Sequence, residues 1–434
     1  MSESRRLNLS EFGQTGISWL YCSVLSQKTM VGATLSCQGS HGAYPLSHRE
    51  IAGRNRNGSP VSESESNSSN DQNLQAAQLA STGVEEKPEV VLERALFEVK
   101  KVVVGQDSMI ERLMICVIAN GHCLLEGPPG LAKTLAAKTL ATVLGGQFAR
   151  LQFTPDLLPA DILGTRIYQP SKEAFDIELG PVFANVVLAD EINRASPKVQ
   201  SALLEVMAER QVSIAGISHP VPEPFIVLAT QNPIESEGVY ALPEAQQDRF
   251  LMKVIIDYPN DREEAEIVRR VGVRIPSVDQ VLTPQLWSSL QELAAEAFVH
   301  DAVVDYAVRL VAATRRPADF GLPEYATYIA YGASPRATLG LIAASRALAL
   351  MRGRRYVLPT DVFSVAPEIL RHRLVLSYEA LANDVDAEQI IARLLRVVWA
   401  PQVSPGPVPT APAPVEPPKV LRVDPPVDPR ARVS

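Results

Sequence analysis

The 434-residue sequence has few cysteines, no surplus of basic charge and no long apolar run. Four cysteines are too few for a disulfide scaffold, so we expect the reducing cytoplasm as the location. The net charge of −8 makes nucleic acid an unexpected partner, because proteins that coat it are normally basic. No run of about eighteen apolar residues occurs, so we expect no membrane span. A hydrophobic content of 46% and a charged content of 21% fit a soluble globular protein with added tails.

Both ends of the chain have compositions that do not suit a packed core. Residues 1–86 show no steady hydrophobic period and include a run of serine, glutamate and asparagine at 62–70, so we expect a disordered extension. Residues 401–434 are rich in proline and valine, which predicts an extended, unpacked tail. Between the tails we expect an α/β domain over 87–275 and an all-helical domain over 276–400.

Five short apolar runs in the α/β region predict strands. Their nearly continuous apolar character suits a parallel sheet that is covered on both faces. Apolar residues at helical spacing predict the covering helices, and from residue 283 onward this spacing predominates. The predicted strands are 122–125, 149–153, 186–189, 225–230 and 252–256. The predicted helices are 90–102, 107–119, 197–209, 283–297, 301–314, 334–351, 360–374 and 386–398.

A phosphate-binding loop is predicted between the first strand and the helix that follows it. Backbone N–H groups of such a loop, with the helix N-terminus, bind phosphate; Lys133 would reach the outer phosphates and the Thr134 hydroxyl would bind Mg²⁺. Ala132 replaces the usual second glycine, and alanine does not tolerate positive φ, so a plain strand-to-helix turn stays an alternative. The loop comprises Gly127, Pro128, Pro129, Gly130, Leu131, Ala132, Lys133 and Thr134.

Polar residues follow two further predicted strands. The carboxyl ends of parallel strands line one crevice, so Asp190 is placed to hold Mg²⁺ and Glu191 to polarise the water that attacks the γ-phosphate. Asn232 follows the next strand and could hydrogen-bond the γ-phosphate or this water. On their own, the acidic pair could simply cap a strand, and Asn232 before a proline could simply form a turn.

Two arginines complete the set of candidates. Arg249 lies before the last strand, where it could reach a neighbouring subunit's γ-phosphate or form a surface ion pair with Asp248 or Glu244. Arg336 lies in the first turn of a predicted helix, which is unfavourable for a cation unless a phosphate lies nearby.

From about residue 88 to residue 400 the chain resembles AAA+ ATPases of the MoxR class. The resemblance implies Walker A at 127–134, Walker B at Asp190 and Glu191, sensor 1 at Asn232, an arginine finger at Arg249 and sensor 2 at Arg336. It implies a P-loop core followed by a helical lid, a helix-2 insertion around 161–183 and a hairpin around 211–219. Alanine before the loop lysine is usual in that class. Arg194 and Arg210 stay rival finger candidates. The matching stretches are 127–134, 151–161, 188–195, 229–233, 244–250 and 333–337.

The resemblance also implies an activity. We expect hydrolysis of ATP with Mg²⁺ in a homo-oligomeric ring, a hexamer, that remodels, matures or activates client proteins. Partners in such systems often carry a von Willebrand factor A domain. The alternatives are a DNA-associated AAA+ motor or transcriptional regulator, against which the acidic charge counts, and a nucleotide-gated assembly module with little turnover.

Overall fold

The computed structural model describes residues 86–171, 173–233, 238–271 and 276–402. The segments predicted to be disordered, 1–86 and 401–434, lie outside the described residues except for Glu86, Pro401 and Gln402. Among the residues that are described, no helix is long and apolar enough to span a bilayer.

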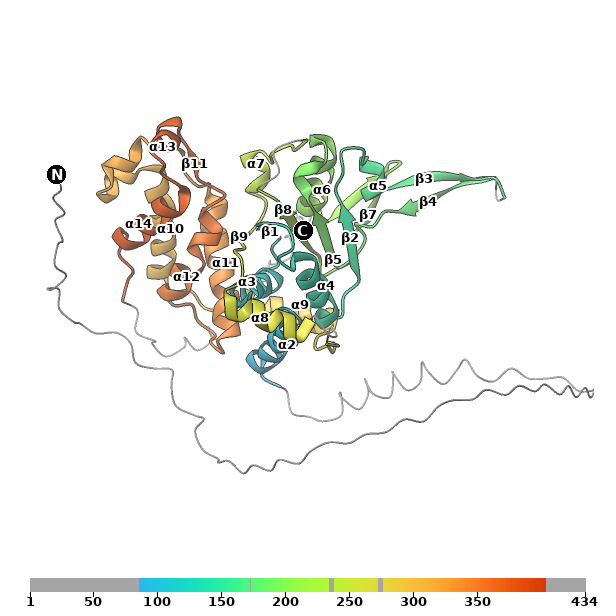
Figure 1. Cartoon of the computed structure of the whole chain (residues 1–434), viewed down its shortest axis with the longest axis horizontal. Coiled ribbons are helices and arrows are strands. Elements are labelled where there is room, and N and C mark those ends of the chain that lie inside the picture. Colours follow the sequence, from blue (N-terminus) through green and yellow to red (C-terminus); the bar gives the residue numbers. More distant parts are fainter. Residues whose placement is uncertain (1–85, 172, 234–237, 272–275, 403–434) are drawn as a thin grey trace, which may run out of the picture. The chain divides into compact units, whose positions relative to one another are not determined.

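A five-stranded sheet forms the centre of the α/β region (Figure 1). The strand order is β2-β5-β8-β1-β9, and every neighbouring pair is parallel. The carboxyl ends of all five strands therefore lie at one edge of the sheet, and their amino ends lie at the other. The strands are β1 (Cys123–Glu126), β2 (Phe148–Gln152), β5 (Val186–Asp190), β8 (Ile226–Gln231) and β9 (Met252–Ile255).

Helices cover both faces of this sheet. Leu125, Leu188 and their neighbours on one face share a hydrophobic core with three helices, α2 (Pro88–Val102), α3 (Asp107–Ile118) and α4 (Lys133–Leu144). Leu124 and Val187, which point the other way, pack against α6 (Pro197–Glu209). Burial on both faces explains why the three inner strands, β1, β5 and β8, read as continuous apolar runs instead of alternating ones.

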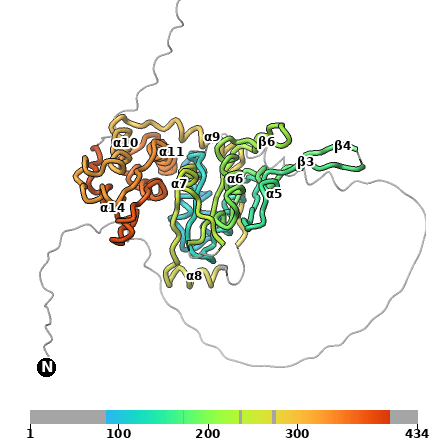
Figure 2. Tube along the Cα trace, turned by 90° about the horizontal axis from the view of Figure 1, so that it is seen from above, coloured from blue at the N-terminus to red at the C-terminus, as the bar shows by residue number. Residues whose placement is uncertain are grey.

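Two hairpins and several short elements are added to this core. Strands β3 (Gly164–Gln169) and β4 (Ala174–Leu179) form an antiparallel hairpin within the predicted insertion, and Figures 1 and 2 show it extending away from the sheet. Strands β6 (Gln211–Ile214) and β7 (Ile217–Pro220) form the second hairpin. The remaining elements of this region are α5 (Pro159–Leu163), the 3₁₀ turn η1 (Ile192–Arg194), α7 (Glu244–Gln247) and α8 (Asp261–Val271).

The C-terminal region is mainly helical, so the prediction of a parallel-sheet core followed by a helical lid is confirmed. Its first helix packs against α3, because Nε1 of Trp287 donates to the carbonyl oxygen of Val117 at 3.1 Å. The domain limits given above stay predictions. The helices are α9 (Pro284–Ala295), α10 (Asp301–Arg315), α11 (Pro335–Met351), α12 (Pro359–Leu370), α13 (Tyr378–Ala382) and α14 (Ala387–Val397), with η2 (Pro317–Phe320), η3 (Pro323–Ala326), β10 (Ile329–Tyr331) and β11 (Val375–Leu376).

One predicted lid helix is shorter than expected. The sequence pattern predicts a helix over 360–374, but α12 ends at Leu370. The residues that follow turn toward the α/β region, where the Arg373 guanidinium is almost completely buried. Apolar periodicity alone does not reveal this end, because Leu374 continues the pattern and is itself buried.

Candidate active site

The predicted phosphate loop connects the carboxyl end of β1 to the N-terminus of α4. Lys133 Nζ donates to the carbonyl oxygens of Gly127 at 2.7 Å and Gln231 at 3.3 Å, so it lies between this loop and the end of β8. A Cβ atom at Gly127 would lie 2.6 Å from the carbonyl oxygen of Ile256, which explains the need for glycine there. Burial lowers the pKa of Lys133, although the nearby carboxylates of Asp190, Glu191 and Glu126 oppose this shift.

Ala132 departs from the expectation that alanine would not adopt positive φ. It has φ +57° and ψ +19°, which is the left-handed conformation, and it is the N-cap of α4. That conformation is strained for a residue with a Cβ atom. At this position the loop therefore has a conformation that glycine adopts readily, and the substitution is not evidence against phosphate binding.

Asp190 lies at the carboxyl edge, at the end of β5. Its Oδ1 accepts from the Thr230 hydroxyl at 2.7 Å, and its Oδ2 accepts from the Thr134 hydroxyl at 3.2 Å and from Arg150 Nη2 at 2.7 Å. Burial alone would raise the pKa of this carboxyl, but the hydrogen bonds from Thr230, Arg150 and Thr134 and the Arg150 charge outweigh it and lower the pKa. Asp190 is consequently ionised at neutral pH.

Glu191 follows with its side chain held by two donors. Its Oε2 accepts from Gln152 Nε2 at 2.9 Å and pairs with Arg194 Nε at 3.0 Å. Its backbone N–H donates to the Thr230 hydroxyl at 2.8 Å, which couples its position to β8. Asn232 follows β8 directly and is buried. The phosphate loop, Asp190, Glu191 and Asn232 thus share one edge of the sheet, as predicted.

The oxygen atoms beside the loop fit a magnesium ion. Thr134 Oγ1 and Asp190 Oδ2 lie 3.2 Å apart, and both are hard oxygen ligands. Mg²⁺ in nucleotide sites commonly uses one or two such protein ligands, together with waters and phosphate oxygens. The described residues contain no cluster of three or more acidic, histidine or cysteine side chains suited to a metal, so these two groups would need the nucleotide to complete a Mg²⁺ site.

Arg249 and Arg336 lie at the other edge of the sheet. They line a cavity of about 450 Å³ together with His122, which immediately precedes β1. The backbone N–H of Leu251 donates to the His122 carbonyl oxygen at 2.8 Å, which places the Arg249 turn at the amino end of β1. Both arginines are exposed, and no residue of the phosphate loop lines this cavity. Since the four residues of β1 span roughly 13 Å, Arg249 and Arg336 are separated from their own chain's phosphate loop.

The rival finger candidates have partners within the chain. Arg194 pairs with Glu191 at the carboxyl edge. Arg210 lines the same cavity as Arg249, but it donates to the carbonyl oxygen of Phe225 at 2.5 Å and to Oδ1 of Asn120 at 3.0 Å. Arg249, whose side chain is exposed, therefore remains the preferred candidate for contact with a neighbouring subunit.

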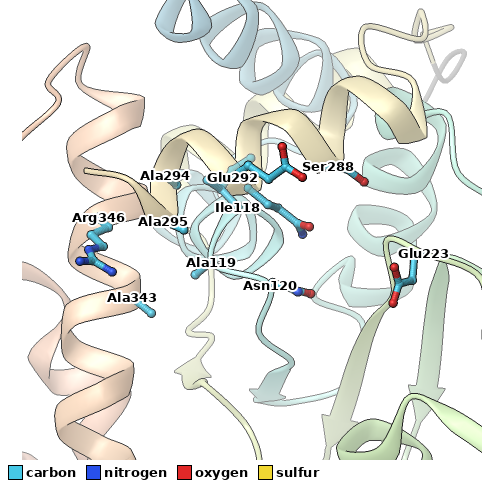
Figure 3. A pocket seen from close by; sticks show the side chains of 11 residues that line it. Ile118, Ala119, Asn120, Glu223, Ser288, Glu292, Ala294, Ala295, Ala343 and Arg346 are labelled. Atoms are coloured by element: carbon cyan, nitrogen blue, oxygen red, sulfur yellow. The ribbon is translucent and has the colours of Figure 1, made fainter. Parts of the chain in front are cut away.

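A second cavity, of about 410 Å³, lies among α3, α9 and α11 (Figure 3). Its charged lining residues include Glu292 on α9 and Arg346 on α11. No predicted site residue lines it, and it is not assigned a function.

Sequence reasoning missed the roles of Arg150 and Gln152. Both lie on β2, whose end is in register with Asp190 of β5. The available signal was that these two polar residues alternate along the strand with the buried Leu151. Recognising it required knowing that β2 and β5 are neighbours in the sheet.

Comparisons with known proteins agree with this architecture. Residues 122–252 match the family model described as the ATPase family associated with various cellular activities, and residues 325–394 match an AAA lid domain. The chaperone MoxR1 of Mycobacterium tuberculosis is 59% identical over 313 residues, which cover 72% of this chain and 83% of that protein. The protein MoxR of Methylorubrum extorquens is 34% identical over 322 residues, covering 70% of this chain and 92% of that protein.

A solved structure is also similar. The crystal structure of a candidate ATPase from Cytophaga hutchinsonii superposes with a TM-score of 0.69 at 45% sequence identity, and the match covers 76% of this chain and 100% of that one. The family models, the relatives and the arrangement of sheet, phosphate loop and lid lead to the same assignment. The chain belongs to the MoxR class of AAA+ ATPases, and it is a nucleotide-binding enzyme that hydrolyses ATP.

Proposed function

We propose that ATP is bound at the carboxyl edge of one subunit and is contacted by Arg249 and Arg336 of the next subunit. The observation that carries this proposal is the location of these two arginines at the opposite edge of the sheet from the phosphate loop. A subunit with the two halves of a site on different edges is suited to head-to-tail assembly, and such assembly closes into a ring when the rotation permits.

Each residue at the carboxyl edge has a proposed role. Lys133 exchanges its carbonyl partners for phosphate oxygens, and Thr134 and Asp190 hold Mg²⁺, which neutralises phosphate charge when it is bound. Glu191 orients and polarises the attacking water, and Asn232 contacts the γ-phosphate or this water. For Glu191 to act on water, its carboxylate must release or share the hydrogen bonds from Gln152 and Arg194.

The proposed biological task is chaperone-like remodelling of client proteins by a hexameric ring in the cytoplasm. Exposed apolar side chains on the β3–β4 hairpin support a role in client contact: Ile167, Tyr168, Phe175 and Leu179 are each at least 41% exposed. Tyr168, Phe175 and Leu179 lie on one face of the hairpin and Ile167 on the other. Exposed apolar surface commonly marks an interaction site. A partner with a von Willebrand factor A domain remains part of the proposal, as the resemblance implies.

The trans arrangement is tested by mixing two inactive variants. Glu191→Gln subunits bind ATP without hydrolysing it but keep both arginines, whereas Arg249→Ala subunits keep an intact phosphate site. An interface is active when an Arg249→Ala subunit supplies the phosphate site and a Glu191→Gln subunit supplies the arginines. Random mixing in equal amounts produces this combination at about one interface in four, so roughly a quarter of wild-type turnover should return. Each variant alone should lose about a thousandfold in kcat.

The controls separate binding from hydrolysis. Lys133→Ala should abolish ATP binding measured by calorimetry, while Glu191→Gln should retain it. If the mixture stays as inactive as its components although both bind ATP and assemble, Arg249 does not act across the interface. Normal hydrolysis by Glu191→Gln would instead contradict the assignment of Glu191.

A further inference from the structure

A lid residue, Arg373, binds the turn that carries Arg249. Arg373 follows α12, and only 3% of its side chain is exposed. Its Nε donates to Asp248 Oδ1 at 2.7 Å, its Nη2 donates to the Phe250 carbonyl oxygen at 2.7 Å, and its Nη1 donates to the Leu251 carbonyl oxygen at 3.2 Å. One guanidinium thus binds the residues on both sides of Arg249, although Arg373 lies 125 positions after Asp248 in the sequence.

The two residues before Arg373 strengthen this attachment. Nη1 of Arg371 donates to the Lys253 carbonyl oxygen at 3.1 Å, and Nε2 of His372 lies 3.1 Å from the Phe250 carbonyl oxygen. The negative end of the α12 dipole favours cationic side chains at this position. Three consecutive lid residues therefore contact the chain from the turn that carries Arg249 into β9.

Asp248 also connects the turn that carries Arg249 to Arg336. Oδ2 of Asp248 accepts from the Ser334 hydroxyl at 2.9 Å, and this hydroxyl in turn accepts from the backbone N–H of Arg336 as the N-cap of α11. Nη1 of Arg336 lies 3.9 Å from the same Asp248 oxygen. Asp248 is thus bonded to both helices of the lid that flank the cavity, through Arg373 and Ser334.

We propose that Asp248, Ser334 and Arg373, here called the finger clamp, hold Arg249 and Arg336 in one fixed arrangement for the neighbouring subunit. Arg373 is then a positioning residue for hydrolysis in a subunit to which it does not belong. This inference rests on the proposed function, because it requires Arg249 and Arg336 to act on the neighbour's ATP. If the lid moves, the clamp would displace Arg249 and Arg336 together.

The complementation mixture tests the clamp, because Arg373→Ala can be placed in either of its two components. In the Glu191→Gln subunit the substitution disturbs the subunit that supplies the arginines. In the Arg249→Ala subunit it disturbs only the subunit that hydrolyses ATP. We expect the first placement to reduce the restored kcat about tenfold or more, since misplacing a catalytic group by about 1 Å can cost a hundredfold, and the second to leave it unchanged.

The difference between the two placements separates loss of arginine positioning from loss of protein stability, because both placements carry the same substitution. Equal losses in both placements, or no loss in either, would overturn the clamp. Absence of any complementation before Arg373 is altered would instead contradict the proposed function. Arg354→Ala is the matched control: Arg354 is another bonded lid arginine, with Nη1 2.8 Å from Asp361 Oδ2, and it should produce no asymmetry.

Two measurements make the test independent of turnover and of one variant's folding. Hydrogen exchange of the ligand-free protein should be faster at the amides of residues 248–250 in Arg373→Ala, because these amides donate only within the turn that Arg373 holds. Unchanged exchange there would count against the clamp. If Arg373→Ala does not fold, as judged by circular dichroism, Ser334→Ala replaces it in both placements and should show the same asymmetry, smaller in size.

Discussion

Arg150 donates from both Nε and Nη2 to one oxygen of Asp190, Oδ2, at distances of 3.1 and 2.7 Å. The hydroxyl of Thr134 reaches the same oxygen. A magnesium ion held by Thr134 and Asp190 would therefore have to share this oxygen with a guanidinium or displace it. Arg150 is half-exposed, so its interaction with Asp190 is partly screened by solvent.

Replacing Arg150 by methionine should make the site easier for Mg²⁺ to occupy. We expect the Mg²⁺ concentration that half-saturates tight ATP binding to fall by roughly two- to fivefold, the range for a half-exposed ion pair. Calorimetric titration of ATP at a series of Mg²⁺ concentrations measures this change. Arg166→Met, in the β3–β4 hairpin, is the control and should not alter it. A higher Mg²⁺ requirement in Arg150→Met would show that Arg150 assists the ion instead.

Removing the Cβ atom from Ala132 should stabilise the protein. Its left-handed backbone is strained for alanine and not for glycine, so Ala132→Gly should raise the free energy of unfolding by about 1 kcal/mol. Urea denaturation provides the measurement. Ala136→Gly, one turn further along in α4, should instead lower it by about 1 kcal/mol. Destabilisation by both substitutions would mean that the loop does not have this conformation in solution.

Two buried histidines should make the protein less stable in mild acid. Burial, with a contribution from the charge of Arg210, lowers the pKa of His122 to about 3, and burial with the charge of Arg373 lowers the pKa of His372 well below 6.5. Between pH 6.5 and about 3 the unfolded chain binds protons that the folded chain does not. The stability that the two neutral histidines contribute is therefore fully present above pH 6.5 and is lost as the pH falls.

The expected loss is about 1.4 kcal/mol per pH unit below 6.5 for each histidine. Urea denaturation between pH 7.5 and 5 measures it. His122→Gln should be less stable at pH 7.5, because it disturbs the bond from the Val227 N–H to Nδ1, but its stability should depend less steeply on pH. An unchanged slope in His122→Gln would show that His122 is protonated in the folded protein.

Polar substitutions in the β3–β4 hairpin should affect clients without affecting basal hydrolysis. The rings of Tyr168 and Phe175 make an edge-to-face contact across the strands, with centroids 5.2 Å apart, and both side chains are about half exposed. The double variant Tyr168→Ser, Phe175→Ser should lose most of the stimulation of turnover by reduced, unfolded α-lactalbumin. Val308→Ser, an equally exposed position on α10, should retain it. Equal stimulation of both variants would remove the hairpin from client contact.

The strands and the phosphate loop could be predicted because their signals are local. All five strands lie within one or two residues of the apolar runs that predicted them, and α6 has the predicted limits. The location of Asp190 and Glu191 beside the loop was predictable because a parallel sheet gathers strand ends at one edge. Arg373 was not, because its partner Asp248 is distant in the sequence and an arginine after a helix is ordinarily exposed.

Arg249 and Lys133 lie at opposite ends of the strands, and this separation has a genetic consequence. If each copy completes the pocket of the copy beside it, a subunit with both Glu191→Gln and Arg249→Ala silences two pockets, its own and its neighbour's. A minority of such subunits, co-expressed with the normal protein, would therefore suppress more activity than their share of the population, and the defect would be inherited as a dominant trait.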